Sequence, residues 1–172
     1  GETVSINYTG NRIAVGVRNH NNSSPSQPGG VKVYQWNGNN WVQIGSDIVG
    51  ENNQDLSFFV SINGLGNRVV VGAPSNDDNG NASGQVRIYE WDSNDWNQIG
   101  GDINGEFTQD VFGSSVDISS SGDYIVAGSP NNSGNGFMSG HVRVFGSPTI
   151  TCTQPLTITL NPVLIGDTIS IT

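Results

Sequence analysis

NRIAVG at residues 11–16 returns as NRVVVG at 67–72 and as DYIVAG at 123–128. The three stretches are separated by about 56 residues, and each continues from polar residues into a short apolar run. Repeats of roughly this length, containing several short apolar phrases, are typical of solenoids, propellers and arrays. The sequence therefore predicts three copies of one structural unit.

Two further phrases recur around this stretch. Apolar and polar residues alternate in VKVYQW at 31–36, VRIYEW at 86–91 and HVRVF at 141–145. WVQIGSDIVGE at 41–51 returns as WNQIGGDINGE at 96–106, but no such phrase follows Phe145. We expect the units to span about 1–55, 56–111 and 112–146. Residues 147–172 would form a last strand, a linker to a following domain or a sorting signal.

Each unit divides into short expected strands. Alternation at 4–6, 60–62 and 116–118 predicts a strand with one buried face. The continuous apolar runs at 13–15, 69–71 and 125–127 predict a central strand covered on both faces. NGNN at 37–40 and DSND at 92–95 have the composition of hairpin turns between the third and fourth strands. The sequence thus predicts an all-β protein in which each unit is a four-stranded antiparallel meander.

One such meander cannot bury both of its faces, so the units must pack on one another. Radial packing of four-stranded blades gives a β-propeller, which usually needs at least four blades, so three units predict an incomplete ring. A β-helix is less favoured because its strands are parallel. A sandwich would not require three near-identical units.

Composition narrows the classes of partner. The formal net charge is −9 with only six Lys and Arg residues, so nucleic-acid binding is not expected. No apolar run is long enough to cross a membrane. Cys152 is the only cysteine, which excludes an internal disulfide. No signal-peptide pattern follows Gly1, and we expect a fragment of a longer protein.

Phe112-Gly113 opens the third unit, Gly128-Ser129-Pro130 follows its second expected strand, and Gly140 to Phe145 form its third; Gly72-Ala73-Pro74 occupies the matching place in the second unit. These stretches resemble the opening, the G-A-P tripeptide and the last element of the FG-GAP repeat of integrin alpha-subunit propellers. The W-x-Q-I-G phrase resembles repeats of large secreted or surface proteins of marine bacteria and algae. The resemblance implies a seven-bladed type of propeller used for extracellular adhesion or ligand recognition.

Two parts of the chain bear on more specific family features. The integrin calcium loop, D-x-D-x-D-G, has no counterpart in the turns at 8–11, 64–67 and 120–123, so calcium is not expected there. Asn161-Pro162-Val163 followed by 166–171 resembles the opening of the type IX secretion sorting domain of Bacteroidetes. The tail is therefore a candidate sorting signal.

Calcium is the one cofactor that the polar residues suggest. Asp77, Asn79 and Asn81 carry oxygen ligands at alternate positions, but the glutamate of an EF-hand loop is absent, so an Asx-rich turn is the favoured interpretation. Asp47, Glu51 and Asp55 recur with the same spacing as Asp102, Glu106 and Asp110. Their recurrence favours a structural role between units, with a divalent ion between blades as the alternative and acid–base catalysis last.

Other side chains suggest ligand or glycan sites. Trp36, Trp41, Trp91 and Trp96 flank the hairpin turns, where cross-strand packing is favoured over stacking on sugar rings. Sequons begin at Asn7, Asn21, Asn22, Asn81 and Asn131, and their use depends on a source that glycosylates. His20 and His141 lie at non-equivalent positions without a nucleophile motif, and both are expected to face solvent.

These observations predict an extracellular, non-catalytic adhesion or binding module within a larger surface or secreted protein. Its partners would be other blades of the same protein or a second copy of the chain, together with an extracellular protein or glycan ligand. A carbohydrate-binding lectin and a structural subunit of an extracellular filament are the alternatives. An enzyme is not expected, because residues repeated in every unit are more suited to building the unit than to reacting.

Overall fold

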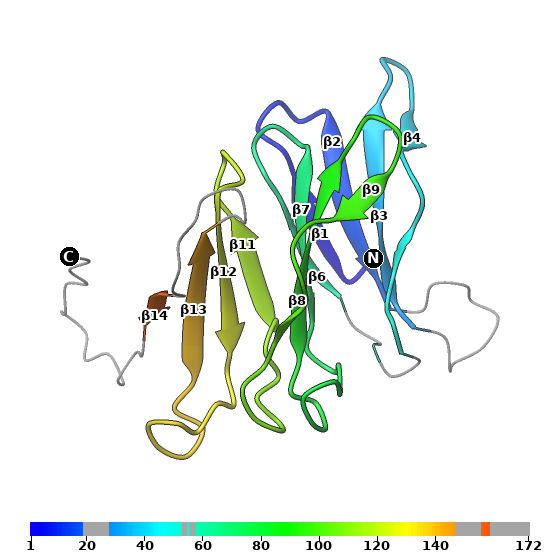
Figure 1. Ribbon diagram of the computed structural model, residues 1–172. Coiled ribbons are helices and arrows are strands. Elements are labelled where there is room, and N and C mark those ends of the chain that lie inside the picture. Colours follow the sequence, from blue (N-terminus) through cyan, green and yellow to red (C-terminus); the bar gives the residue numbers. More distant parts are fainter. Residues whose placement is uncertain (19–27, 53–54, 56–57, 147–155, 159–172) are drawn as a thin grey trace.

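The computed structural model describes residues 1–18, 28–52, 55, 58–146 and 156–158. These residues form three antiparallel sheets joined by turns and loops, with no helix among them and no closed barrel (Figure 1). The predicted all-β class is confirmed. Because the described part has no helix, it contains none that could cross a bilayer.

Each sheet is a meander whose strands follow one another in the chain. The first contains β1 (Thr3–Ile6), β2 (Arg12–Val17), β3 (Gly30–Trp36), β4 (Trp41–Gln43) and β5 (Ile48–Val49). The second contains β6 (Phe59–Ile62), β7 (Arg68–Ala73), β8 (Gln85–Trp91), β9 (Trp96–Gln98) and β10 (Ile103–Asn104). The third contains β11 (Ser115–Ile118), β12 (Tyr124–Ser129), β13 (His141–Gly146) and β14 (Leu156–Ile158).

The first two sheets have five strands, not the four that the sequence predicts. β4 pairs with the end of β3 at Tyr34–Trp36, whereas β5 pairs with its start at Gly30 and Val31. The break between them contains Gly45, whose positive φ of 70° suits a glycine, and Gly100 repeats this bend in the second sheet with a φ of 74°. The two short strands therefore form one interrupted row beside the third strand.

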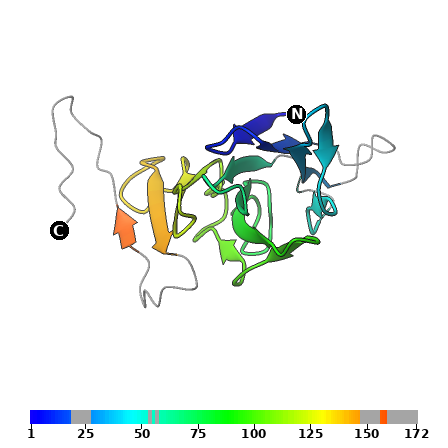
Figure 2. The same cartoon turned by 90° about the horizontal axis from the view of Figure 1, so that it is seen from above.

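The second sheet is covered on both faces. Its leading face, which we define as Val60, Ile62, Val69, Val71, Tyr89 and Trp96, packs on Ala14, Val31 and Val33 of the first sheet. Its trailing face, defined as Val70, Val86 and Ile88, packs on Ile118, Ile125 and Ala127 of the third. Seen from above in Figure 2, the second sheet lies between the other two. The continuous apolar run of β7 is thus buried from both sides, as predicted for a central strand.

The prediction for the first strand is wrong in the first sheet. Val60 and Ile62 of β6 are buried, but the matching Val4 and Ile6 of β1 are 72% and 60% exposed. Among the described residues, no sheet covers the leading face of the first sheet, whereas that sheet itself covers β6. Alternation therefore marks a face built for burial, and the neighbouring sheet decides whether burial occurs.

The tail contributes one strand to the described structure. β14 pairs antiparallel with β13, matching Val142–Val144 with Leu156–Ile158. A last strand was one of the interpretations of residues 147–172, and β14 lies within that range. Cys152 and the candidate sorting motif at 161–171 lie outside the described residues.

Candidate functional site

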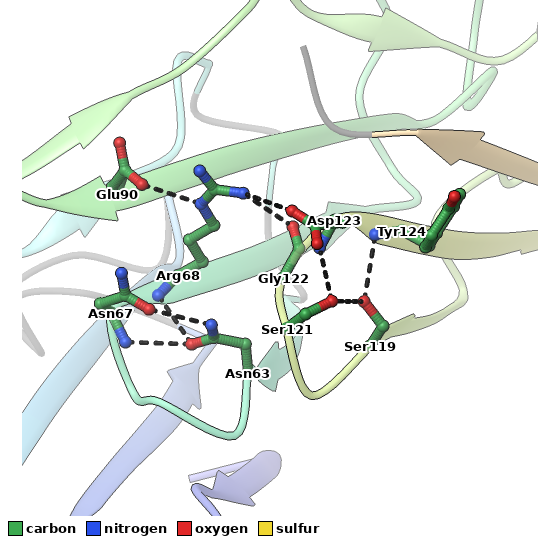
Figure 3. A network of polar contacts seen from close by, with 9 residues as sticks. All are labelled: Asn63, Asn67, Arg68, Glu90, Ser119, Ser121, Gly122, Asp123 and Tyr124. Atoms are coloured by element: carbon green, nitrogen blue, oxygen red, sulfur yellow. Dashed lines mark hydrogen bonds and ion pairs between the residues drawn. The ribbon is translucent and has the colours of Figure 1, made fainter. Parts of the chain in front are cut away.

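An arginine at the start of the second strand ties each of the first two sheets to the next. Arg68 Nε donates to Glu90 Oε1 at 2.8 Å, and Nη1 donates to the carbonyl oxygen of Gly122 in the third sheet at 3.0 Å (Figure 3). Nη1 also lies 3.6 Å from Asp123 Oδ1. Arg12 repeats the arrangement, with Nη1 donating to the Gly66 carbonyl at 2.9 Å. Charged hydrogen bonds of this kind are stronger than neutral ones.

A second pair of arginines makes contacts in the opposite direction along the chain. Arg87 and Arg143 reach back to the carbonyl oxygens of Val49 and Asn104, at 3.4 and 2.7 Å. The Arg143 guanidinium also lies 3.7 Å from the centre of the Phe112 ring, a cation–π geometry. Burial lowers the pKa of Arg143 from its ordinary value. Both arginine positions therefore serve the contact between sheets.

The repeated carboxylates have basic or amide partners. Asp47 Oδ2 lies 2.9 Å from Lys32 Nζ, and this contact raises the pKa of Lys32. Glu51 pairs with Arg87 at 3.5 Å and Glu106 with His141 at 3.1 Å, each across two sheets. Asp102 accepts a hydrogen bond from Gln98 at 2.8 Å. These contacts are those of a structural role, the interpretation that the sequence favours for this set.

The described residues offer no convergent set of metal ligands. They contain no group of three or more His, Cys, Asp or Glu side chains placed to hold an ion. Asp77 Oδ1 accepts the N–H of Ala82, Asn79 donates to the Gly105 carbonyl, and Asn81 accepts from Gln109. These contacts shape a turn, so the residues do not fit a calcium cage.

Buried polar atoms at the two interfaces between sheets differ in their hydrogen bonding. Asp55 Oδ1 and Asn76 Nδ2 are buried without a hydrogen-bond partner. At the next interface the matching residues are bonded, because Asn132 Nδ2 donates to Asp110 Oδ2 at 2.9 Å. The same Asp110 oxygen also accepts the Phe107 N–H, so this carboxylate ties a turn to the third sheet.

The four tryptophans form two cross-strand pairs at the hairpins. The ring centres of Trp36 and Trp41 are 5.6 Å apart, and those of Trp91 and Trp96 are 5.3 Å apart. Trp96 is buried and its Nε1 donates to the Ile44 carbonyl of the first sheet at 3.2 Å. Trp36 and Trp41 are exposed, so they are the members of the set that a ligand could reach.

The sequons differ in accessibility. Asn7 is only 4% exposed, and its Oδ1 accepts the N–H groups of Asn11 and Arg12 within the turn. A glycan on Asn7 would disrupt that turn. Asn81 is exposed and Asn131 is half-buried, whereas Asn22 lies outside the described residues.

The turns between the first and second strands of all three sheets meet at one end of the molecule, here called the turn end. They surround a hollow of about 430 Å³, lined by Tyr8, Thr9, Asn11, Arg12, Gln35, Gly64, Leu65 and Ser120. Tyr8 and Leu65 are largely exposed. Asn7 and Asn63 cap the first two turns through backbone N–H groups, and Ser119 Oγ does the same in the third. The hollow therefore combines rigid turns with side chains that differ between repeats.

The long loops between the second and third strands lie at the opposite end, here called the loop end. In the third sheet they border a hollow of about 460 Å³ whose lining includes Phe107, Gln109, Asn131, Phe137 and Met138. Phe107, Phe137 and Met138 are exposed. In the second sheet the residues that match Phe137 and Met138 are Asn81 and Ala82, whose carbonyl oxygens accept N–H groups of the segment leading to the third sheet. This hollow is thus an uncovered counterpart of a contact between sheets.

The sequence did not reveal the role of several residues at the interfaces between sheets. His141 was expected to face solvent, but its side chain is 8% exposed and contacts Glu106, because the interface with the second sheet encloses it. The bridging arginines were not singled out, although the repeated N-R pair at 11–12 and 67–68 was visible. Their carbonyl acceptors have no signature in the sequence.

No protein-family model matches the chain, and no curated protein matches it. The function is therefore argued from the residues and contacts described above.

Proposed function

We propose that the chain forms consecutive blades of an extracellular β-propeller of FG-GAP type that acts as a non-catalytic adhesion or binding module. The observation that carries the proposal is the repeated contact between sheets. The same arginine and carboxylate positions that recur in the sequence join the first sheet to the second and the second to the third. Residues that would be candidates for catalysis are thereby used in packing.

The neighbouring arrangement of β1, β6 and β11 further supports a propeller. β6 contacts both β1 and β11, and these three are the first strands of their sheets. First strands that lie next to one another are expected where blades surround an axis. The extracellular location is supported by the acidic, lysine-poor composition alone.

We propose the hollow at the turn end as the ligand-binding surface. Three repeats contribute to it, and it presents Tyr8, Leu65 and Ser120 at corresponding turns. Loops that a rigid scaffold positions are common places for binding. An exposed aromatic ring among amide and hydroxyl groups suits a protein or glycan ligand.

Binding of the purified chain to panels of extracellular matrix proteins and glycans would test this function. For a ligand found there, Tyr8→Ser with Leu65→Ser should weaken binding by about tenfold or more, as expected for loss of central contacts. Phe107→Ser, an exposed change at the loop end, is the matched control and should leave binding unchanged. A panel without any ligand, or a ligand indifferent to the double variant, would contradict the proposal.

A further inference from the structure

Each contact between sheets buries one phenylalanine in a glycine-lined socket of the preceding sheet. Phe112 lies against Gly84 and packs with Val86, while Gly113 lies on Gly72. A Cβ atom at Gly72 would overlap the carbonyl oxygen of Gly113. Glycine is therefore needed there to let the incoming backbone approach.

The first sheet has the same socket. Phe58 is fully buried, its carbonyl lies against Gly16 and its ring lies against Gly29. Val31 belongs to the same cluster. Full burial of a phenylalanine side chain is strongly stabilising, so each filled socket is a substantial part of its interface.

Backbone hydrogen bonds fix the segment that carries the phenylalanine. Phe112 and Val111 donate their N–H groups to the carbonyls of Ser83 and Ala82, each at 3.0 Å. Gln109 donates to Asn81 at 2.8 Å. Pairing of Gly84 with Phe112 is parallel. The segment thus lies along the loop and the start of β8.

The third sheet has a socket of the same form. Gly128, Gly140 and Val142 match Gly72, Gly84 and Val86, and they line a cavity of about 400 Å³ together with Ser129, Pro130 and His141. Among the described residues, no phenylalanine lines this cavity. Val86, the counterpart of Val142 in the second sheet, is fully buried, whereas Val142 is only half-buried.

This third socket already has the shape of the filled one. The φ angles of Ala82 and Met138 are 47° and 51°, so both loops make the same left-handed bend. Gly84 and Gly140 donate their N–H groups to Asn76 and Asn132, both at 3.0 Å. The carbonyls of Met138 and Ser139 therefore take the positions of the acceptors that hold Val111 and Phe112.

We propose that the cavity beside Gly128 and Gly140 is a docking site for a phenylalanine-bearing segment of another repeat sheet. The occupant is a turn-forming segment that places a phenylalanine as Phe112 is placed, bound parallel to the start of β13. A second copy of this chain does not suit the site, because its Phe58 and Phe112 are already buried in its own sockets. The inference rests on the blade arrangement of the proposed function, but not on its adhesive role.

A peptide with the sequence of residues 103–115 is the probe, titrated into the isotope-labelled full chain and followed by NMR. We expect saturable shifts of the Ser129 and Gly140 amides. A peptide with alanine at the position of Phe112 should bind at least about tenfold more weakly, since an aromatic anchor is lost.

Two variants of the full chain locate the binding. Gly128→Ala should abolish it, because the new Cβ would meet the backbone of the peptide. In the chain itself that Cβ meets only the Ser115 hydroxyl, an exposed side chain that can rotate, so folding is preserved. Gly101→Ala, with no atom within 4 Å of the new Cβ, is the matched control and should bind as the parent does.

Three results of the titration would overturn the proposal. They are no saturable shifts up to about 2 mM peptide, equal affinity for the alanine peptide, or binding that Gly128→Ala leaves intact. Sedimentation of the chain alone tests whether a second copy of the chain occupies the socket. Self-association that Gly128→Ala abolishes would assign the socket to that second copy and would also overturn the proposal. Failure of the protein and glycan panels would leave the peptide result unaffected, so the two proposals fail separately.

Discussion

The leading faces of the first and second sheets are built from nearly the same residues but have different surroundings. Trp96 of the second sheet is 7% exposed, and the matching Trp41 of the first sheet is 40% exposed. The second face is covered by the first sheet, while no described residues cover the first face. The comparison separates what a repeat encodes, a face suited to burial, from what its neighbour supplies, the burial itself.

The exposed face of the first sheet is consequently an apolar patch, whereas the second sheet is covered on both faces. It includes Val4, Ile6, Trp36 and Trp41, all exposed. Patches of this kind commonly mark interaction sites. Since its counterpart in the second sheet receives a sheet of the same type, the proposed propeller would place another blade on it.

The largest difference between the two faces is expected for the tryptophans. Trp96→Ala should lower the free energy of unfolding by about 3–5 kcal/mol, because it leaves a cavity between two sheets and removes the bond to Ile44. Trp41→Ala should cost about 1 kcal/mol, since that ring is partly in water. Denaturant unfolding of the two variants measures both values. Equal losses would mean that the first face is covered in solution.

A smaller difference is expected at the first strands. Ile62→Ala should cost about 2–4 kcal/mol, because Ile62 is buried between sheets. Ile6→Ala should change stability by less than about 0.5 kcal/mol, as is usual for exposed positions. Thermal melts of the two variants, with the parent as reference, provide the test. If Ile6→Ala lowered the stability as much as Ile62→Ala does, the leading face of the first sheet would be covered in solution.

The same comparison explains how far the sequence could predict the structure. Apolar periodicity and the repeated phrases predicted the strands at 3–6, 12–17 and 30–36 and their counterparts, because these signals are local. Exposure of Val4 and Ile6 could not be predicted, since it depends on a neighbouring sheet and not on the strand. The added strand β5 was missed because two residues are too few to show a period.

The candidate site was less predictable than the fold. The pairing of Trp91 with Trp96 follows from the hairpin between them and was anticipated. The bridge from Arg68 to Gly122 was not, because its acceptor is a backbone carbonyl that any residue could supply. The glycine socket was visible only in part, as the G-A-P-like tripeptides, since the overlap at Gly72 appears only once two sheets are packed.

The smallest expected difference concerns pH. Asp95 on the second sheet accepts the N–H groups of Ser46 and Trp96 at 2.7 and 2.8 Å, and Ser46 Oγ also donates to it. The bond from the Ser46 backbone, followed by that from Trp96, holds the pKa of Asp95 below its ordinary value of 3.8. The matching residue on the first sheet is Asn40, which cannot titrate.

A carboxylate with a lowered pKa stabilises the folded state above its unfolded pKa, and this contribution is lost as the pH falls through the folded pKa. The Ser46 amide resonance should therefore shift with a midpoint below 3.8, the ordinary value for Asp95. Asp95→Asn should remove the shift, whereas Asp92→Asn, a change at a carboxylate that does not contact Ser46, should preserve it. A midpoint at or above the ordinary value would show that Asp95 does not hold the first sheet in solution. The two faces would then differ by apolar burial and by the arginine contacts, which include the ion pair of Arg87 with Glu51.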